Sequence, residues 1–419
     1  MKRTLTLVIA VIMVLCLAST AMAELSGTIR FSTWGSQAEK EINEAIIAAF
    51  EEENPGCHVE LEYIPSAYTT TIDTEFVGGD APDVIYGHPH YFVSWASNDL
   101  LMNLDEMFEE DKDFFYDDKF STSMYDMFMY DGHHIGTING HDTFLLFYNK
   151  DLFDAAGVAY PTDDWTWDDF LAAAEKLSFD DGENKQYALS LDQLSVQAII
   201  YSFGGNLFDD MTTPTEVVYN SEDTVAALKM IQDCVKAGYI PETRDSELIG
   251  GTFATGKFAM QITGAWAVAS YMGVDAFKWD VAQVPLRTGY PRRTSAFVAG
   301  YAVNDQTKNP ELAKAFAKYF QSDRAQTLLS SLGLITVINH EISGSDEVLN
   351  APGSPEHAAL RVTTIDNATN GYANLTNFIE MLDTVITPAY DRLLACTESP
   401  EDVATDIQQG MEALLAEVQ

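Results

Sequence analysis

Two short segments of this sequence combine aromatic and polar side chains that could hold a small ligand. They are Trp34-Gly35-Ser36-Gln37 and Gly87-His88-Pro89-His90-Tyr91. Flat aromatic rings can cover the apolar faces of a ligand, and polar groups beside them can fix its orientation through hydrogen bonds. The residue types therefore indicate non-covalent binding, and these two segments are the first places where we expect a ligand.

The patterns that would indicate catalysis or a metal centre are weak. His88-Pro89-His90 and His133-His134 have no Cys or Glu at ligand spacing, and Asp180-Asp181-Gly182-Glu183-Asn184 is too short for a calcium loop. Pairs of carboxylates, as in a glycosidase, are abundant in so acidic a chain, so their presence does not indicate a catalytic site. Cys57 follows a turn at the start of a predicted strand, so we interpret it as a small core residue. We predict no enzymatic activity, no metal and no cofactor.

Both candidate segments follow strands of a predicted α/β fold. Residues 28–34 and 57–63 alternate in the manner of strands, and a short apolar run covers residues 84–86. Between the first two lies a helical pattern over residues 42–50, which Asn54-Pro55-Gly56 ends. Alternating strands and helices imply a largely parallel sheet. Such open sheets bind ligands beyond the carboxyl ends of their strands, where both segments are expected to lie.

The stretch from Phe147 to Leu177 predicts two capped helices after a strand at residues 144–148. The first helix ends at Gly157, which tolerates the left-handed conformation of a helix stop. Thr166 and Asp169 form an N-terminal capping box for the second helix, whose apolar residues recur at helical spacing. Apolar residues in that pattern are usually core, so we interpret this stretch as scaffold.

The N-terminus has the pattern of a secretory signal peptide over residues 1–23. Lys2 and Arg3 precede the run 5–17, which is apolar apart from one threonine, and Ala21-Met22-Ala23 fits a cleavage site. The mature chain is predicted to begin at Glu24. Leu15 before Cys16 differs from the small residue that precedes lipoprotein cysteines, so we favour a soluble exported form over a lipid anchor.

Composition bounds the function further. The net charge of −41 disfavours nucleic acid or an anionic membrane as a main partner. A chain of 419 residues with 47% hydrophobic residues can bury more than one core, which predicts two lobes. The predicted mature chain keeps Cys57, Cys234 and Cys396, which permit at most one disulfide, and the pairing is left open.

Several short motifs, in a fixed order, resemble the extracellular solute-binding proteins of the maltose-binding type, the receptors of ABC importers for sugars. The resemblance covers essentially the whole mature chain. The motifs are Ala81-Pro82-Asp83-Val84, Tyr148-Asn149-Lys150-Asp151-Leu152-Phe153, Thr166-Trp167-Asp168-Asp169-Phe170, Phe253–Met260 with Gly264-Ala265-Trp266, and Ser399-Pro400-Glu401-Asp402. The chain departs from the family at Gly333-Leu334-Ile335-Thr336-Val337, where relatives usually have a proline, which leaves the hinge contacts of that segment open.

The resemblance implies the two-lobe periplasmic-binding-protein fold of type II, with the ligand cleft between lobes that are each a largely parallel sheet flanked by helices. We expect the first lobe to comprise residues 24–139 and, after the crossover, 296–340. The second lobe is expected to comprise residues 140–295 and a helical C-terminal part, 341–419.

The resemblance also implies ligand contacts. Trp266 is expected to stack on a sugar from the second lobe, Asp142 to accept hydroxyl hydrogens, and Gly300 to bring backbone close to the ligand. The full predicted set of ligand-binding residues is Trp34, Ser36, Gln37, Tyr68, His90, Tyr91, Asp142, Trp266, Gly300, Tyr301, Tyr372 and Asn374.

The predicted function is that of a periplasmic receptor that closes around a mono- or oligosaccharide and delivers it to a membrane permease of an ABC importer. We expect a monomer with no nucleic-acid partner. Two alternatives remain. Arg287, Arg292 and Arg293 could favour an anionic sugar, such as a uronate or sugar phosphate, and an exported carbohydrate-active enzyme could share the fold.

Overall fold

The computed structural model describes residues 25–120, 122–182, 184–242, 253–331, 333 and 335–418. The predicted signal peptide with Cys16, the predicted mature N-terminus Glu24, and Glu183 and Leu334 lie outside the described residues. Within the described part of the chain, no helix combines the length and apolar character needed to span a membrane.

One sheet of eleven strands runs through the molecule in the order β2-β1-β3-β11-β6-β9-β8-β7. β10 and β12 also pair with β6, and β13 pairs with β11. The strands are β1 Gly27–Thr33, β2 Cys57–Tyr63, β3 Val84–Gly87, β6 Thr137–Asn149, β7 Phe179–Asp180, β8 Lys185–Ser190, β9 Phe258–Gly264, β10 Trp279–Gln283, β11 Thr294–Val303, β12 Thr336–Val337 and β13 Ala368–Asn370. A separate hairpin joins β4 (Met129–Tyr130) to β5 (His133–His134).

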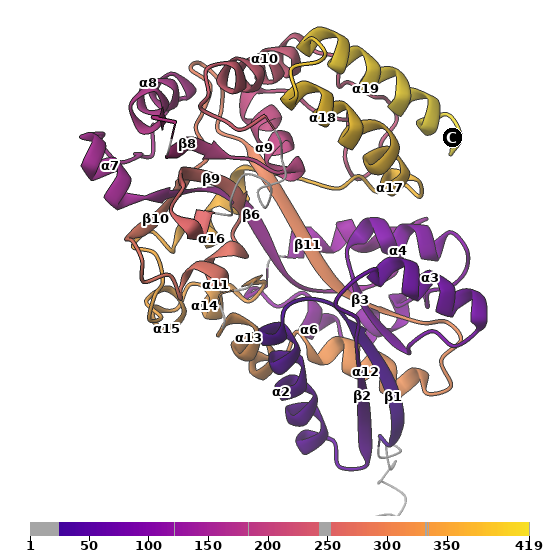
Figure 1. The fold of residues 1–419 in the computed structure, drawn as a ribbon. Coiled ribbons are helices and arrows are strands. Elements are labelled where there is room, and N and C mark those ends of the chain that lie inside the picture. The colour runs from indigo at the N-terminus through magenta and orange to yellow at the C-terminus, as the bar shows by residue number, and fades with distance from the viewer. Residues whose placement is uncertain are drawn as a thin grey trace, which may run out of the picture.

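Helices flank this sheet in both halves of the molecule. They are α2 Gln37–Glu53, α3 Tyr68–Gly78, α4 Pro89–Ala96, α5 Asp105–Glu110, α6 Lys112–Phe115, α7 Lys150–Ala156, α8 Trp167–Leu177, α9 Gln193–Phe203, α10 Glu222–Lys236, α11 Ala267–Tyr271, α12 Pro310–Tyr319, α13 Asp323–Ser330, α14 His340–Ser343, α15 Asp346–Leu349, α16 Leu360–Thr363, α17 Phe378–Met381, α18 Thr387–Leu394 and α19 Pro400–Leu415. Figure 1 shows β1, β2 and β3 with α2, α3, α4 and α12 in the lower half, and β8 and β9 with α8, α10, α18 and α19 in the upper half.

Each half has its own hydrophobic core. The core of the lower half, called the first half below because it contains β1, includes Phe31, Ile46 and Phe316. The core of the upper half, called the second half below, includes Leu146, Ile231 and Met411. Among the strands that the structure describes, β6 and β11 are the two that run through both halves (Figure 1), and they pair with each other antiparallel. The sheet is therefore more mixed than the alternation of strands and helices predicts, because these two long strands interrupt the parallel pairs β1–β2, β1–β3 and β8–β9.

The local signals in the sequence correspond to helix ends in the structure. Thr166 caps α8, with Asp169 completing the predicted capping box, and Gly157 ends α7 with φ of 62°. The buried face of α8 includes Trp167, Phe170 and Leu177, so this stretch packs as scaffold. Ser399 caps α19, the last helix. The segment that departs from the family's proline pattern forms β12, which pairs with β6 at Gly140 and His141.

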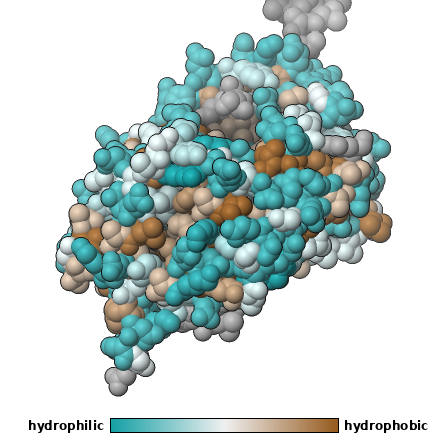
Figure 2. Space-filling view, turned by 90° about the horizontal axis from the view of Figure 1, so that it is seen from above, coloured by the Kyte–Doolittle hydropathy of each residue, from teal (hydrophilic) through white to brown (hydrophobic). Residues whose placement is uncertain are grey.

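The surface of the upper half is largely hydrophilic. Figure 2 views the upper half from above and shows hydrophilic residues over most of this face, with hydrophobic residues in small separate patches.

The three cysteines of the described chain, Cys57, Cys234 and Cys396, are all free thiols, so no disulfide links them. Burial raises the pKa of the Cys234 thiol to about 12, which makes it unreactive.

A carboxyl pair on the first half predicts a pH dependence of stability. Partial burial, and then the hydrogen bond and charge of Glu62, raise the pKa of Glu75 to about 7, while Arg30 opposes the shift. A carboxyl group whose pKa is higher in the folded state than in the unfolded chain destabilises the fold as pH rises between the two values. We therefore expect stability to decline from about pH 4.5 to 7 at this pair, and Glu75→Gln to remove the decline. Melting temperatures of both proteins across this range measure it; parallel profiles would contradict the assignment.

Candidate ligand-binding site

A cavity lies where the two cores meet. On β6, Ile138 belongs to the core of the lower half and Phe144 to the core of the upper half. On β11, Val298 belongs to the core of the lower half and Phe297 to the core of the upper half. The cavity has a volume of about 410 Å³ and is lined by residues of both halves, including Asn139 and Asp142 from this part of β6. Its size lies within the range of roughly 300 to 1,000 Å³ that is usual for small-molecule sites.

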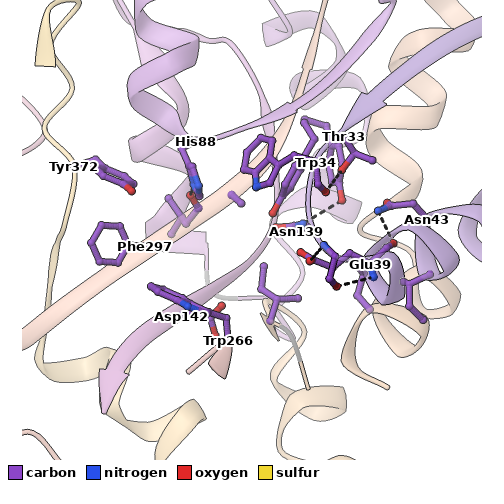
Figure 3. Close-up of a pocket in the computed structure, with 18 of the residues that line it drawn as sticks. Thr33, Trp34, Glu39, Asn43, His88, Asn139, Asp142, Trp266, Phe297 and Tyr372 are labelled. Carbon is purple, nitrogen blue, oxygen red and sulfur yellow. Dashed lines mark hydrogen bonds between the residues drawn. The ribbon is translucent and has the colours of Figure 1, made fainter. Parts of the chain in front are cut away.

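Five rings line the cavity in a continuous series, which we call the aromatic arc: Trp34, His88, Tyr372, Phe297 and Trp266. Neighbouring ring centroids along this series are 5.4, 5.4, 4.6 and 6.0 Å apart. Trp34 and His88 come from the ends of β1 and β3, and the other three rings come from the second half (Figure 3). The arc therefore supplies a wall of aromatic surface that joins the two halves.

Trp34 is held in place from behind by two tyrosines. The Tyr68 and Tyr86 ring centroids lie 4.7 and 4.4 Å from the Trp34 ring. The Tyr68 hydroxyl lies 2.9 Å from the Ser32 hydroxyl and donates to the carbonyl of Tyr86 at 2.8 Å. Tyr68 is thus a buried support for Trp34.

Trp266 lies against the backbone of the strand that precedes it. A Cβ atom on Gly264 would fall 1.9 Å from the Trp266 indole, so glycine is required there for the ring to occupy its position. Phe144 and Phe297 contact the same indole with tilted, edge-type geometry. The ring remains half-buried and lines the cavity, so part of its surface is available to a ligand.

Two polar oxygens at the inner wall have no hydrogen-bond partner among the described residues. Asn139 donates its amide to the Tyr301 hydroxyl at 3.1 Å, which leaves its Oδ1 as an unpaired acceptor. The second unpaired oxygen is Asp142 Oδ1. Burial raises the pKa of Asp142 well above its usual value, against the opposing effects of the Arg361 charge and a backbone bond from Thr336.

The first turn of α2 forms the opposite end of the cavity. Ser36 and Glu39 close a capping box, in which the Ser36 hydroxyl accepts from the Glu39 amide at 3.3 Å and the Glu39 carboxylate accepts from the Ser36 amide. Gly35 has φ of 123°, and a Cβ there would meet the Glu39 carboxylate. Figure 3 shows Glu39 and Asn43 at this end, away from Tyr372.

Among the described residues that line the cavity, none is a lysine or arginine. Arg287, Arg292 and Arg293, which suggest an anionic ligand in the sequence, have hydrogen-bond partners within the protein outside the cavity. Arg287 pairs with Asp223, and Arg292 donates to the carbonyls of Val284 and Asp163. Arg293 donates to Asn206 at 2.6 Å and Thr369 at 3.0 Å.

The histidine pairs also have structural partners. His133 and His134 bond the two oxygens of Asp105 through their Nδ1 atoms, at 2.6 and 2.9 Å. His88 Nδ1 bonds a backbone carbonyl. Among the described residues, no three His, Cys, Asp or Glu side chains are grouped in a way that could hold a metal ion.

Half of the predicted ligand-binding residues line the cavity, and half do not. Those that line it are Trp34, Ser36, Asp142, Trp266, Tyr301 and Tyr372. Gln37 is exposed, Tyr68 and His90 are buried behind the aromatic arc, and Tyr91 packs beside them. Gly300 faces the Thr137 carbonyl of β6, and Asn374 donates to the Met127 carbonyl across the two halves.

Several lining residues were not selected from the sequence, including His88, Asn139 and Phe297. His88 lies in a segment that the sequence does single out, but α4 begins at Pro89 and turns His90 inward. Every residue of β6 and of β11 is buried, so no alternation of apolar and polar residues marks the side of these strands that faces the cavity.

Comparison with known proteins identifies the family. A model of the family described as bacterial extracellular solute-binding protein matches residues 34–327. A galactooligosaccharide-binding protein of Bacillus subtilis is 22% identical over 386 residues, covering 89% of this chain and 85% of its own. The structure of an ABC substrate-binding protein of Listeria monocytogenes in complex with cycloalternan has a TM-score of 0.83 at 27% identity, covering 93% of this chain and 99% of that one.

A second solved structure shares the fold but contains a different kind of ligand. UgpB of Mycobacterium tuberculosis, solved in complex with glycerophosphocholine, has a TM-score of 0.78 at 17% identity and covers 94% of this chain and 99% of that one. The likenesses to solved structures confirm the predicted type II periplasmic-binding-protein fold, and the family match confirms the resemblance in the sequence motifs.

Proposed function

Since the chain belongs to the bacterial extracellular solute-binding proteins, we propose that it is the receptor of an ABC importer that captures a neutral saccharide between its lobes. The observation that carries this proposal is the cavity at the junction of the two halves, with an aromatic wall, unpaired acceptors and no lysine or arginine among its described lining residues. The relatives whose names specify oligosaccharides support the same class of ligand.

The chemistry of the site suits a polyol with apolar ring faces. The indoles of Trp34 and Trp266 can each cover one ring face of a sugar, which removes apolar surface from water. Asn139 Oδ1 is buried and needs a donor, which a sugar hydroxyl supplies, and the buried Asp142 carboxyl can exchange a hydrogen bond with a hydroxyl in either direction. An anion in this place would meet the unpaired Asn139 Oδ1 and the Glu39 carboxylate, with no lysine or arginine among the described lining residues to balance its charge, so the site disfavours a ligand of negative charge.

We infer that capture involves closure of the two lobes about the strands that join them, and that a membrane permease receives the ligand. The lobe boundaries are proposed at residues 139/140, 295/296 and 340/341. The exported monomer, cleaved after Ala23, is part of the same proposal, and the family to which the chain belongs supports the exported location. The bound sugar is returned unchanged, which separates a receptor from a carbohydrate-active enzyme.

The anionic alternative makes a distinct prediction at Arg292. Since its guanidinium donates to the Val284 and Asp163 carbonyls outside the cavity, we expect Arg292→Ala to lower the melting temperature and to leave saccharide affinity unchanged. Affinity is also expected to be the same in low and high salt. Calorimetric titrations at two salt concentrations check both points. Binding of a uronate or sugar phosphate that weakens with salt and disappears in Arg292→Ala would favour the alternative.

A thermal-shift screen tests the proposed function. Neutral mono- to oligosaccharides are compared with uronates, sugar phosphates and glycerophosphodiesters at matched concentrations. A ligand that binds the folded state raises the melting temperature in a saturable way. We expect this from at least one neutral saccharide and a smaller shift from its charged counterpart. A broad panel of carbohydrates without any shift would refute the sugar assignment.

A further inference from the structure

The hydrogen bond of His88 determines what its free nitrogen can do for a ligand. His88 Nδ1 lies 2.8 Å from the Val298 carbonyl oxygen. A carbonyl can only accept, so Nδ1 carries the hydrogen, and in the neutral imidazole Nε2 is then an acceptor without a hydrogen. The ring lines the cavity, so the nitrogen left for a ligand is this acceptor.

The ring cannot turn easily to exchange its two nitrogens. Trp34 lies on one side at 5.4 Å between centroids, and Tyr372 approaches from the second half at 5.4 Å. His90 stacks nearly parallel behind it, with an interplanar angle of 13°, and Tyr91 contacts it at 5.9 Å. Figure 3 shows His88 between Trp34 and Tyr372 at the cavity wall. The contacts from both halves fix the orientation of the imidazole.

The surroundings favour the neutral ring. Burial lowers the pKa of His88, with the Val298 bond opposing the shift, and its position at the start of α4 also disfavours a positive charge. The titratable groups whose rings pack against it are His90 and Tyr91 from α4 and Tyr372 from the second half. The pKa of His90 is lowered well below its usual value, and those of Tyr91 and Tyr372 are raised, so these neighbours are also uncharged. Glu39 and Asp142 are the carboxyl groups of the same cavity.

We propose that His88 is a specificity-determining residue, whose Nε2 accepts a hydrogen bond from one hydroxyl of the bound saccharide. This inference rests on the proposed function and adds to it a required hydroxyl. A site that presents a buried acceptor rejects an analogue that lacks the matching donor, because the acceptor is then left unpaired.

Two variants separate the roles of the two nitrogens. In His88→Asn the amide can still donate to the Val298 carbonyl but nothing replaces Nε2, whereas in His88→Gln the longer amide reaches the Nε2 position. We expect His88→Asn to weaken binding about tenfold or more and His88→Gln to weaken it less. A series of monodeoxy saccharides, each lacking one hydroxyl of the ligand, identifies the hydroxyl that His88 binds. Removing that hydroxyl should lower the affinity of the wild type about tenfold. The affinity of His88→Asn should be the same for this deoxy compound and for the complete saccharide.

Nitrogen-15 spectra of the histidine rings test the tautomer without a ligand. We expect Nδ1 of His88 protonated and Nε2 unprotonated in the free protein, with the Nε2 resonance moving upfield when saccharide binds. A free protein with the proton on Nε2, or an Nε2 resonance and deoxy profile unaffected by a saccharide that does bind, would overturn the inference alone. A wild type that binds no saccharide would overturn the proposed function and the inference with it.

Discussion

Trp266→Ala is expected to weaken saccharide binding about thirtyfold or more, which corresponds to about 2 kcal/mol or more. Trp266 is half-buried against Phe144 and Phe297 and lines the cavity, so a ligand can cover its remaining surface. Truncation removes both that surface and the exclusion of water behind it. Calorimetric titration with the saccharide found by screening gives the affinity, and the melting temperature without ligand shows whether the fold is intact.

Trp266→Phe and Gly264→Ala are the matched variants for this prediction. The smaller ring keeps an aromatic face, so Trp266→Phe should retain most of the affinity. Gly264→Ala keeps the indole but forces it to move, because the new Cβ would lie 1.9 Å from the ring. We expect it to behave like Trp266→Ala. Wild-type affinity in a folded Trp266→Ala protein would show that the ligand does not contact this side of the cavity.

Gly300→Ala is expected to destabilise the protein by about 3 kcal/mol. A Cβ on Gly300 would lie 1.8 Å from the Thr137 carbonyl oxygen and 3.0 Å from the Phe128 ring. The pairing of β11 with β6 shifts register at Ala299 and Gly300, so the glycine permits the close approach of the two strands that join the lobes. Backbone on both sides cannot move without breaking this pairing. Urea denaturation measures the loss.

Gly78→Ala is the control for this substitution. Gly78 is the last residue of α3, and a Cβ there would have no atom within 4 Å. Alanine favours a helix over glycine by up to about 1 kcal/mol, so this variant should keep or slightly raise the stability. If Gly300→Ala unfolds at the same urea concentration as Gly78→Ala, the close approach of β11 to β6 is not as tight as described.

The sequence predicts local elements well where the signal is carried by neighbouring residues. Thr166 with Asp169 and Gly157 mark helix ends that the structure contains, because capping depends on a few adjacent groups. The family motifs are equally informative, since they fix the fold through an ordered series of short segments. The order of β6 and β11 in one continuous mixed sheet is a long-range property that no local pattern encodes.

The site is predicted less completely for the same reason. Trp34 and Trp266 follow strands and line the cavity, but His90 turns into the core because α4 starts one residue before it. Gly300 allows β11 to approach β6 closely. A glycine that lets the backbone approach a ligand would look the same in the sequence, so the residue type alone does not distinguish the two roles. Asn139 and Phe297 lie on strands whose residues are all buried, so only the tertiary structure shows which of them face the cavity.

A receptor that carries an unmodified neutral saccharide between its lobes should release that sugar when it is denatured. We would purify the protein from its native host, denature it and record the mass spectrum of the compound that is released. We predict a neutral mono- or oligosaccharide, present in amounts close to one per protein and unchanged after prolonged incubation with fresh protein. Release of a phosphorylated or carboxylated compound would contradict a neutral ligand, and cleavage of the released sugar during that incubation would contradict a receptor that leaves its ligand unmodified.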